Sequence, residues 1–188
     1  MKNNILSLKL KFLYIAEFGA LASLFPFLTY YFQSRGMSYT EIGIAYAVYS
    51  IVGVISQPIW GIITDKYSNK RTTLIITMVL SSIAVYNFIF AKGFYFILFS
   101  IVLLLIFQSS VLPVADAYSY EIMDHHKDIQ YGRIRLMGSI SFAIIALFLG
   151  YIVKYYGINS VFFLYSAAML LGAFIVYTLP DIYKALLQ

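Results

Sequence analysis

The chain alternates between long apolar runs and short polar breaks, and this pattern predicts its main elements. A run of about 18 or more apolar residues is long enough for a helix to cross the hydrocarbon core of a bilayer. Six such runs are present, separated by breaks that hold turn residues and most of the charge. We expect transmembrane helices at approximately residues 12–32, 42–63, 74–91, 94–117, 136–153 and 161–179.

The polar breaks are short, so residues 1–188 are expected to form one compact, all-α membrane domain. The first run begins after basic residues, and Ala20–Ala22 could imitate a cleavage site for a signal peptide. However, Glu17 interrupts the run before this point, and apolar residues continue well beyond it. A signal peptide has a shorter uninterrupted apolar region, so we interpret the run as a retained span.

Composition excludes a soluble protein. The chain is 62% hydrophobic and 11% charged, whereas a soluble domain is roughly 25% charged. Its formal net charge of +5 is explained by topology, because lysine and arginine favour cytoplasmic loops. Ten of the thirteen lie at the termini and in the second and fourth breaks: Lys2, Lys9, Lys11, Lys66, Lys70, Arg71, Lys127, Arg133, Arg135 and Lys184.

The other three basic residues, Arg35, Lys92 and Lys154, fall in the first, third and fifth breaks. This split predicts a multi-pass protein of the cell membrane with both termini in the cytoplasm. It also accounts for the positive charge without a nucleic-acid partner, and none is expected.

Three charged residues lie within or at the ends of the runs. A charge in mid-membrane costs about 2.5–3.5 kcal/mol, so it usually faces the bundle interior and marks function. Glu17 lies in the first run, Asp116 near the end of the fourth and Arg135 at the start of the fifth. Glu17 is either a proton site or a carboxylate neutralised by protonation or by a neighbour.

Helical spacing gives Arg135 a polar and aromatic neighbourhood. Ser139 and Phe142 follow it at i+4 and i+7 on one face, and Ser109 and Pro113 precede Asp116 at the same spacing. If the two faces meet, Asp116 and Arg135 form a charge pair in a hydroxyl-bearing wall. This pair is either a ligand site or a structural clamp between the fourth and fifth helices.

Arg133 and the second run complete the list of polar candidates. Arg133 is two residues before Arg135 and points to nearly the opposite side, which suits a surface anchor. The second run carries a stripe of small and polar residues that is either a cavity wall or a packing face. Its members are Tyr46, Tyr49, Ser50, Gly53 and Gln57.

Other chemistries find no support. The chain has no cysteine, and its two histidines, His125 and His126, are adjacent in a polar break. Adjacent histidines on a helix do not converge on one metal ion, and no apolar run contains the histidine that a serine intramembrane protease needs. A phosphate-binding loop is also missing from the sequence. We therefore expect no enzyme activity, no metal and no cofactor.

The break after the second run reads "GIITDKYSNKR" from Gly61 to Arg71. It resembles the cytoplasmic signature of the major facilitator superfamily, and six spans with both ends inside resemble one half of that fold. Four further motifs are similar to the oligosaccharide:proton symporter branch, the lactose permease-like group. They are "FPF" at Phe25–Phe27, "QPIWGIITDK" at Gln57–Lys66, "PVADA" at Pro113–Ala117 and "YGRIRLMGS" at Tyr131–Ser139.

The resemblance implies a fold and a set of partners. One half of this fold is a bundle of two inverted three-helix repeats, and the substrate binds between two such halves. The chain is therefore expected to need a second six-helix half, either a missing C-terminal half or another copy in a homodimer. The remaining partners are the lipid bilayer and a small-molecule substrate with proton coupling.

The resemblance also implies roles for single residues. Asp116 and Arg135 match a carboxylate and an arginine that bind sugar together, and Phe142 matches an aromatic ring that stacks on it. Ser139 lies on the same face. The related permeases have glutamate and tryptophan at the positions of Asp116 and Phe142, and the family pattern does not predict Glu17.

The signature loop is expected to act as a gate, through Gly61, Asp65, Lys66, Lys70 and Arg71. Gly61 is expected to let the second and third helices approach closely. Asp65 is expected to lie just past the end of the second helix, where it pairs with a base or caps a helix. The signature glycine after Asp65 is replaced in this chain.

We expect the N-terminal half of a secondary active transporter for a sugar or other small organic solute, coupled to protons and working by alternating access. Two alternatives remain open. One is a half-size or exporter-type transporter for aromatic or drug-like compounds. The other is a membrane partner or receptor that does not transport.

Overall fold

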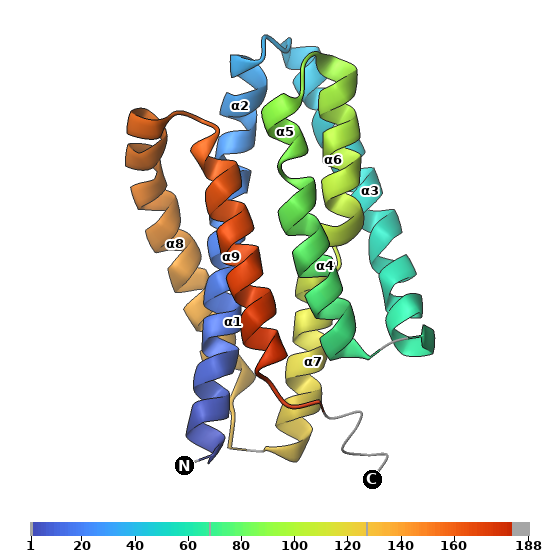
Figure 1. Ribbon diagram of the computed structural model, residues 1–188, viewed down its shortest axis with the longest axis vertical. Coiled ribbons are helices and arrows are strands. Elements are labelled where there is room, and N and C mark those ends of the chain that lie inside the picture. Colours follow the sequence, from blue (N-terminus) through green and yellow to red (C-terminus); the bar gives the residue numbers. More distant parts are fainter. Residues whose placement is uncertain (1, 68, 127, 182–188) are drawn as a thin grey trace.

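A computed structural model describes residues 2–67, 69–126 and 128–181, and every regular element in this part is helical. Six stretches are long and apolar enough to span a membrane, which confirms the expected all-α bundle. They are Asn4–Ser34, Tyr39–Lys66, Lys70–Phe90, Phe94–His125, Tyr131–Tyr156 and Ser160–Tyr177. Helix α1 begins and α9 ends at the same end of the bundle (Figure 1).

Three of the six spans are interrupted. The first consists of α1 (Lys2–Leu24), the 3-10 turn η1 (Phe25–Phe27) and α2 (Leu28–Ser34). The third divides into α4 (Lys70–Ala84) and α5 (Asn87–Phe90), and the fourth into α6 (Phe94–Gln108) and α7 (Val111–His125). The other spans are single helices: α3 (Tyr39–Tyr67), α8 (Tyr131–Tyr156) and α9 (Ser160–Tyr177).

The interruptions have local causes. Pro26 lies in η1, and Pro113 lies in the first turn of α7, where a missing N–H costs little because the first four N–H groups of a helix have no intrahelical partner.

The start of α3 is fixed by a capping box. The backbone N–H and hydroxyl of Ser38 donate to Glu41 Oε2 at 2.7 and 2.8 Å, and Ser38 Oγ accepts from the Glu41 N–H at 3.3 Å.

Several helices extend beyond the apolar runs that predict them. Helix α1 begins near the N-terminus instead of at residue 12, and α8 begins at Tyr131 instead of residue 136. Hydropathy detects only the part of a helix that lies in hydrocarbon. Long basic side chains keep their charge at the interface while their apolar stems cover the helix, so a helix can continue through such residues.

Helix α1 is central. It packs chiefly against α8 and α9, while α9 also packs on α4 and α3 packs on α6 (Figure 1). In the most apolar stretches of α3 and α8 only 17% of residues are buried, against 56% for the first span. Helices α3 and α8 therefore present large uncovered faces to whatever surrounds this bundle.

Small residues bring α1 and α8 into close contact. A Cβ at Gly138 of α8 would lie 2.8–3.2 Å from three ring atoms of Phe18, and one at Gly19 would lie 2.8 Å from Ile145 Cδ1. Ser141 Oγ donates a 2.9 Å hydrogen bond to the Ile15 carbonyl across the same interface. The two backbones approach because side chains are missing or small there, as is common between membrane helices.

The contact at Gly138 generates a stability prediction. Gly138→Ala should destabilise the chain by about 1–3 kcal/mol, because the new methyl overlaps the Phe18 ring in a packed interface. Gly150→Ala is the matched control in α8, since nothing lies within 4 Å of its Cβ position. It should be neutral or slightly stabilising. Thermal unfolding in detergent measures both, and equal midpoints would show that the contact does not constrain the two helices.

Candidate functional site

Asp116 of α7 is held by two tyrosine hydroxyls. Tyr14 of α1 donates to Asp116 Oδ1 at 2.5 Å, and Tyr131 of α8 donates to the same oxygen at 2.8 Å. The Ser119 hydroxyl lies 3.4 Å from that of Tyr14. The carboxylate is half-buried, and hydrogen bonds to a charged acceptor are stronger than neutral ones. Three helices therefore meet at Asp116.

Arg135 is held by aromatic rings. Its guanidinium carbon lies 4.4 Å from the ring centroid of Phe18 and 5.8 Å from that of Tyr14, distances at which a cation is attracted to a ring face. Its Nη1 is buried without a hydrogen-bond partner. Among the described residues, Arg135 and Asp116 form no ion pair within 4.0 Å. The expected direct contact is absent, and a contact bridged by a substrate stays a prediction.

The other predicted residues of α8 lie along one uncovered face. Ser139 is exposed and Phe142 is half-buried, one and two turns beyond Arg135. Arg133 is exposed, on the side of α8 away from the Phe18 ring. The face that carries Arg135, Ser139 and Phe142 is thus only partly covered by the described chain, with the half-buried Tyr131 at its beginning.

Glu17 lies one turn beyond Tyr14 on α1 and is fully buried. Neither of its carboxylate oxygens has a hydrogen-bond partner in the described part of the chain. Both Asp116 and Arg135 are within its electrostatic reach. The hydroxyl of Tyr165 on α9, also fully buried and near Ser81, is another polar group of this interior. An ionised carboxylate in such surroundings is costly, whereas a protonated one is tolerated.

A groove of about 400 Å³ lies between α1, α3 and the α6–α7 break. Most of the predicted polar stripe of α3 lines it, together with Gln108, Ser109 and Pro113. The lining residues of the stripe are Tyr49, Ser50, Gly53 and Gln57. Tyr46 instead contacts Thr29, with 2.7 Å between their hydroxyl oxygens. The stripe is therefore a cavity wall over most of its length. The groove ends one turn from Asp116.

The predicted reasons for two gate residues are wrong. A Cβ at Gly61 would meet nothing within 4 Å, so Gly61 allows no close approach of α3 and α4. Asp65 lies inside α3, which ends at Tyr67, and Asn69 caps α4 in its place by accepting from the Thr72 N–H at 2.7 Å. Hydropathy ended the helix too early, because its last turn is polar.

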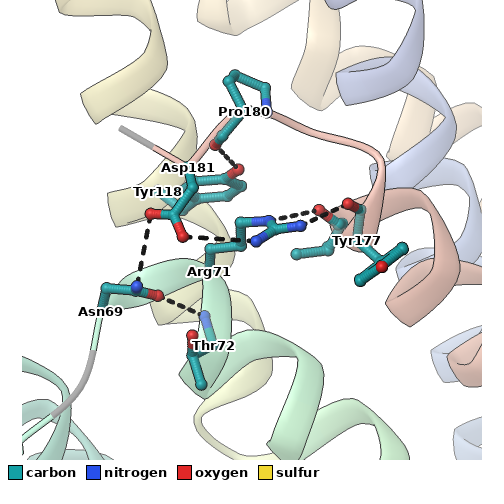
Figure 2. Close-up of polar contacts among 8 residues, drawn as sticks. Asn69, Arg71, Thr72, Tyr118, Tyr177, Pro180 and Asp181 are labelled. Carbon is teal, nitrogen blue, oxygen red and sulfur yellow. Dashed lines mark hydrogen bonds and ion pairs between the residues drawn. The ribbon is translucent and has the colours of Figure 1, made fainter. Parts of the chain in front are cut away.

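Arg71, at the start of α4, connects α4 to the end of α9 (Figure 2). Its Nη2 donates to the Tyr177 carbonyl at 2.5 Å, its Nε donates to the Val176 carbonyl at 3.3 Å, and its Nη1 lies 3.5 Å from Asp181 Oδ2. These carbonyls belong to the last turn of α9, where a helix is partly negative and attracts a cation.

Neighbouring contacts fix the same end of the bundle. The Tyr118 hydroxyl of α7 donates to the Pro180 carbonyl at 2.7 Å, and Asn69 Nδ2 lies 3.5 Å from Asp181 Oδ1 (Figure 2). Lys70 Nζ lies 3.2 Å from Glu121 Oε2. Helices α4, α7 and α9 are therefore joined by polar contacts at this end. Lys66 lies nearby, in the last turn of α3.

Sequence reasoning missed Tyr14, Phe18 and Tyr131, which hold Asp116 and Arg135 in place. A signal for one of them was present, because Tyr131 precedes Arg135 by one helical turn and shares its face. Tyr14 lies 102 residues before Asp116, and nothing in the local pattern connects them. In the part of the chain described here, no three histidine, cysteine or acidic side chains gather in a way that could hold a metal ion.

Comparisons with known proteins agree with this architecture. Residues 7–186 match the sequence model of the MFS_1 like family. The chain is 30% identical over 168 residues to the maltose permease of Geobacillus stearothermophilus, covering 89% of the chain and 42% of the permease. It is 24% identical over 173 residues to the uncharacterized transporter YwbF of Bacillus subtilis (strain 168), covering 91% of the chain and 43% of that protein.

A solved structure shows the same fold. The crystal structure of the nucleoside transporter NupG superimposes with a TM-score of 0.85 at 21% sequence identity, over 97% of this chain and 46% of that one. The chain thus spans less than half the length of these relatives. The relatives are named as a permease and as transporters, not as enzymes. The chain belongs to the MFS_1 like family and has the fold of an N-terminal six-helix half of the major facilitator superfamily.

Proposed function

We propose that the chain is the N-terminal half of a secondary active transporter that moves a sugar or another small polar solute by alternating access, coupled to protons. The observation that carries this proposal is the arrangement of Asp116 and Arg135. Both contact Tyr14, Asp116 through the hydroxyl and Arg135 beside the ring, and they form no ion pair within 4.0 Å in the described chain. A groove with several polar side chains in its wall reaches Pro113, one turn before Asp116. The relatives are named for maltose and for nucleosides, which are both rich in hydroxyl groups.

The chemistry of the site suits a polyhydroxylated solute. Asp116 retains Oδ2 as an acceptor, because both tyrosines donate to Oδ1. Arg135 offers a planar fork of donors with its Nη1 unpartnered. Ser139 adds a hydroxyl, and Phe142 a ring for the apolar face of a sugar or for a base. We assign substrate binding to these four residues, since a ligand needs a few convergent polar groups in an apolar wall.

We assign the proton to Glu17. It is fully buried without a partner, and it lies within electrostatic reach of Asp116 and Arg135. If it is protonated in this state, its burial is tolerable. Loss of the proton would create a negative charge beside the substrate site. Proton and solute would then influence each other's binding, and such linkage is reciprocal.

The uncovered faces of α3 and α8 support a second six-helix half as the partner. The groove and the α8 face with Ser139 would otherwise meet lipid, where polar groups are costly. A C-terminal half of the same transporter is the first candidate and a second copy of the chain is the other. The ten-to-three split of basic residues supports cytoplasmic termini in the cell membrane.

The contacts of Arg71 are proposed to be one side of the gate at the cytoplasmic end. They join α4 to the last turn of α9 and to Asp181, while Lys70 joins α4 to α7 through Glu121. Alternating access requires that one half moves largely as a rigid body. These contacts keep the cytoplasmic ends of three helices together during such a movement. Asp65 and Lys66 lie at the end of α3, across the short break from α4.

The first prediction separates two arginines on α8. Arg135→Lys should lower solute uptake at least tenfold, because an ammonium cannot replace the planar donor fork or its stacking on Phe18. Arg133→Lys should leave uptake nearly unchanged, because an exposed anchor needs only its charge. Uptake of labelled maltose and of labelled uridine into cells expressing this half joined to its C-terminal half measures both. Equal sensitivity of the two positions would reject the assigned roles.

The second prediction concerns the proton. Glu17→Gln should preserve binding of the solute and its exchange across the membrane, but abolish accumulation against a gradient, because glutamine mimics a permanently protonated carboxyl. Exchange and pH-driven accumulation are measured in the same vesicles. Glu41→Gln is the matched control, because it also neutralises a carboxylate but lies at the exposed start of α3, where glutamine can still cap the helix, and it should accumulate solute normally. Normal accumulation by Glu17→Gln would remove the proton from this residue.

The third prediction tests the contacts at the cytoplasmic end. Arg71→Lys should lower the free energy of unfolding by about 1–2 kcal/mol, because one ammonium cannot replace donors to two carbonyls and a carboxylate at once. Lys70→Gln should cost less than about 1 kcal/mol, since an ion pair at this exposure is weak. Denaturant unfolding in detergent compares them. A larger loss for Lys70→Gln would contradict the assigned importance of Arg71.

A further inference from the structure

We propose that Tyr14 and Tyr131 are positioning residues that keep Asp116 from forming an ion pair with Arg135, so that both charges stay available to a solute. This inference rests on the proposed function, because it explains how the assigned substrate site is kept open. It adds two residues from helices α1 and α8 that neither the charge pattern nor the resemblance predicts.

The separation of the two charges needs an explanation. Opposite charges in a medium of low dielectric constant attract each other strongly. Arg135 has a long, flexible side chain and a buried Nη1 without a hydrogen-bond partner, and both charges contact Tyr14, Asp116 at its hydroxyl and Arg135 beside its ring. In the described chain, however, no ion pair joins them within 4.0 Å. Some other contact must satisfy each group.

The tyrosines satisfy Asp116. Both hydroxyls donate to Oδ1, at 2.5 Å from Tyr14 and 2.8 Å from Tyr131. Tyr131 is one turn before Arg135 on α8, so it reaches Asp116 from the helix that carries the arginine. Its ring stacks on Tyr120, with centroids 4.6 Å apart, and meets the Tyr14 ring edge-on at 6.3 Å. These ring contacts hold the two donors in their positions.

The rings of α1 satisfy Arg135 in turn. The guanidinium lies over Phe18 at 4.4 Å, and Tyr14 presents its ring to the same group at 5.8 Å. Tyr14 therefore acts on both charges, with its hydroxyl on the carboxylate and its ring beside the guanidinium. Phe18 is fixed against Gly138, where no side chain would fit. Each charge thus has a partner other than the opposite charge.

This arrangement has a consequence for binding. A solute that displaces an ion pair must compensate for the loss of that pair, whereas a solute that meets two separated charges need not. A neutral solute with several hydroxyls can donate to Asp116 Oδ2 and accept from Arg135, because the tyrosine bonds occupy only Oδ1. The site is therefore preorganised for a neutral solute that carries both donors and acceptors.

The simpler reading is that the tyrosines only satisfy a half-buried carboxylate. A double-mutant cycle in this chain separates the two readings. The thermal midpoints of Asp116→Asn, Arg135→Gln and the double variant are measured in detergent, first with both tyrosines and then with Tyr14→Phe and Tyr131→Phe. Phenylalanine keeps the rings and removes only the two donors.

With the tyrosines present, Asp116 and Arg135 are linked only through Tyr14, so the proposal expects weak coupling and shifts in midpoint that add to within about 2 °C. Without the hydroxyls, Asp116 and Arg135 should pair, and the shifts should depart from additivity by about 5 °C or more. Additive shifts in both backgrounds would overturn the proposal, and so would strong coupling in both. If the double tyrosine variant does not fold, Tyr131→Phe alone serves as background, with a smaller departure expected.

Tyr120→Phe is the matched control. It removes a hydroxyl from the same aromatic cluster, but Tyr120 makes no hydrogen bond to Asp116 in the described chain. Coupling should remain weak in this background, and a departure from additivity of about 5 °C or more there would also count against the proposal. The cycle needs no transport, so its outcome is independent of the uptake tests. Failure of Asp116→Asn to alter uptake would reject the substrate site, while the cycle alone decides whether the tyrosines separate the charges.

Discussion

Polar groups inside a bilayer have no water to bind, so they must find partners within the protein, and at the candidate site α1 provides several of them. Tyr14 donates to Asp116 on α7, the Ile15 carbonyl accepts from Ser141 on α8, and Phe18 lies under Arg135. Glu17 is buried on the same helix. The candidate site is therefore arranged around α1, although two of its charges belong to other helices.

Packing and chemistry share residues in this arrangement. The Phe18 ring fills the space opposite Gly138 and also holds the guanidinium of Arg135. Its position sets the distance between α1 and α8 and the direction of the arginine together. A change in the contact of the two helices thus changes the site directly, without a longer path of coupled residues. This is the geometry that a bundle needs if movement of a helix is to alter the affinity for a solute.

The sequence predicts the spans and the family well, because both signals are local. A run of apolar residues marks a span wherever the span packs in the bundle. The family motif is likewise contained in the eleven residues from Gly61 to Arg71. The partners of Asp116 were not predictable in this way. Spacing placed Asp116 and Arg135 on polar faces, but a charge pattern favours the opposite charge as partner. The actual donors are neutral tyrosines, and one of them is 102 residues away.

The central position of α1 has a consequence for biogenesis. Its first neighbours in space, α8 and α9, are the last helices of the described chain to be synthesised, and Ser141 follows Ile15 by 126 residues. During synthesis α1 must enter the membrane before the surfaces that bury Glu17 exist. The acid that the finished bundle encloses is thus uncovered in the nascent protein until the fifth and sixth spans arrive, and during that interval the protonated carboxyl is the form that lipid tolerates.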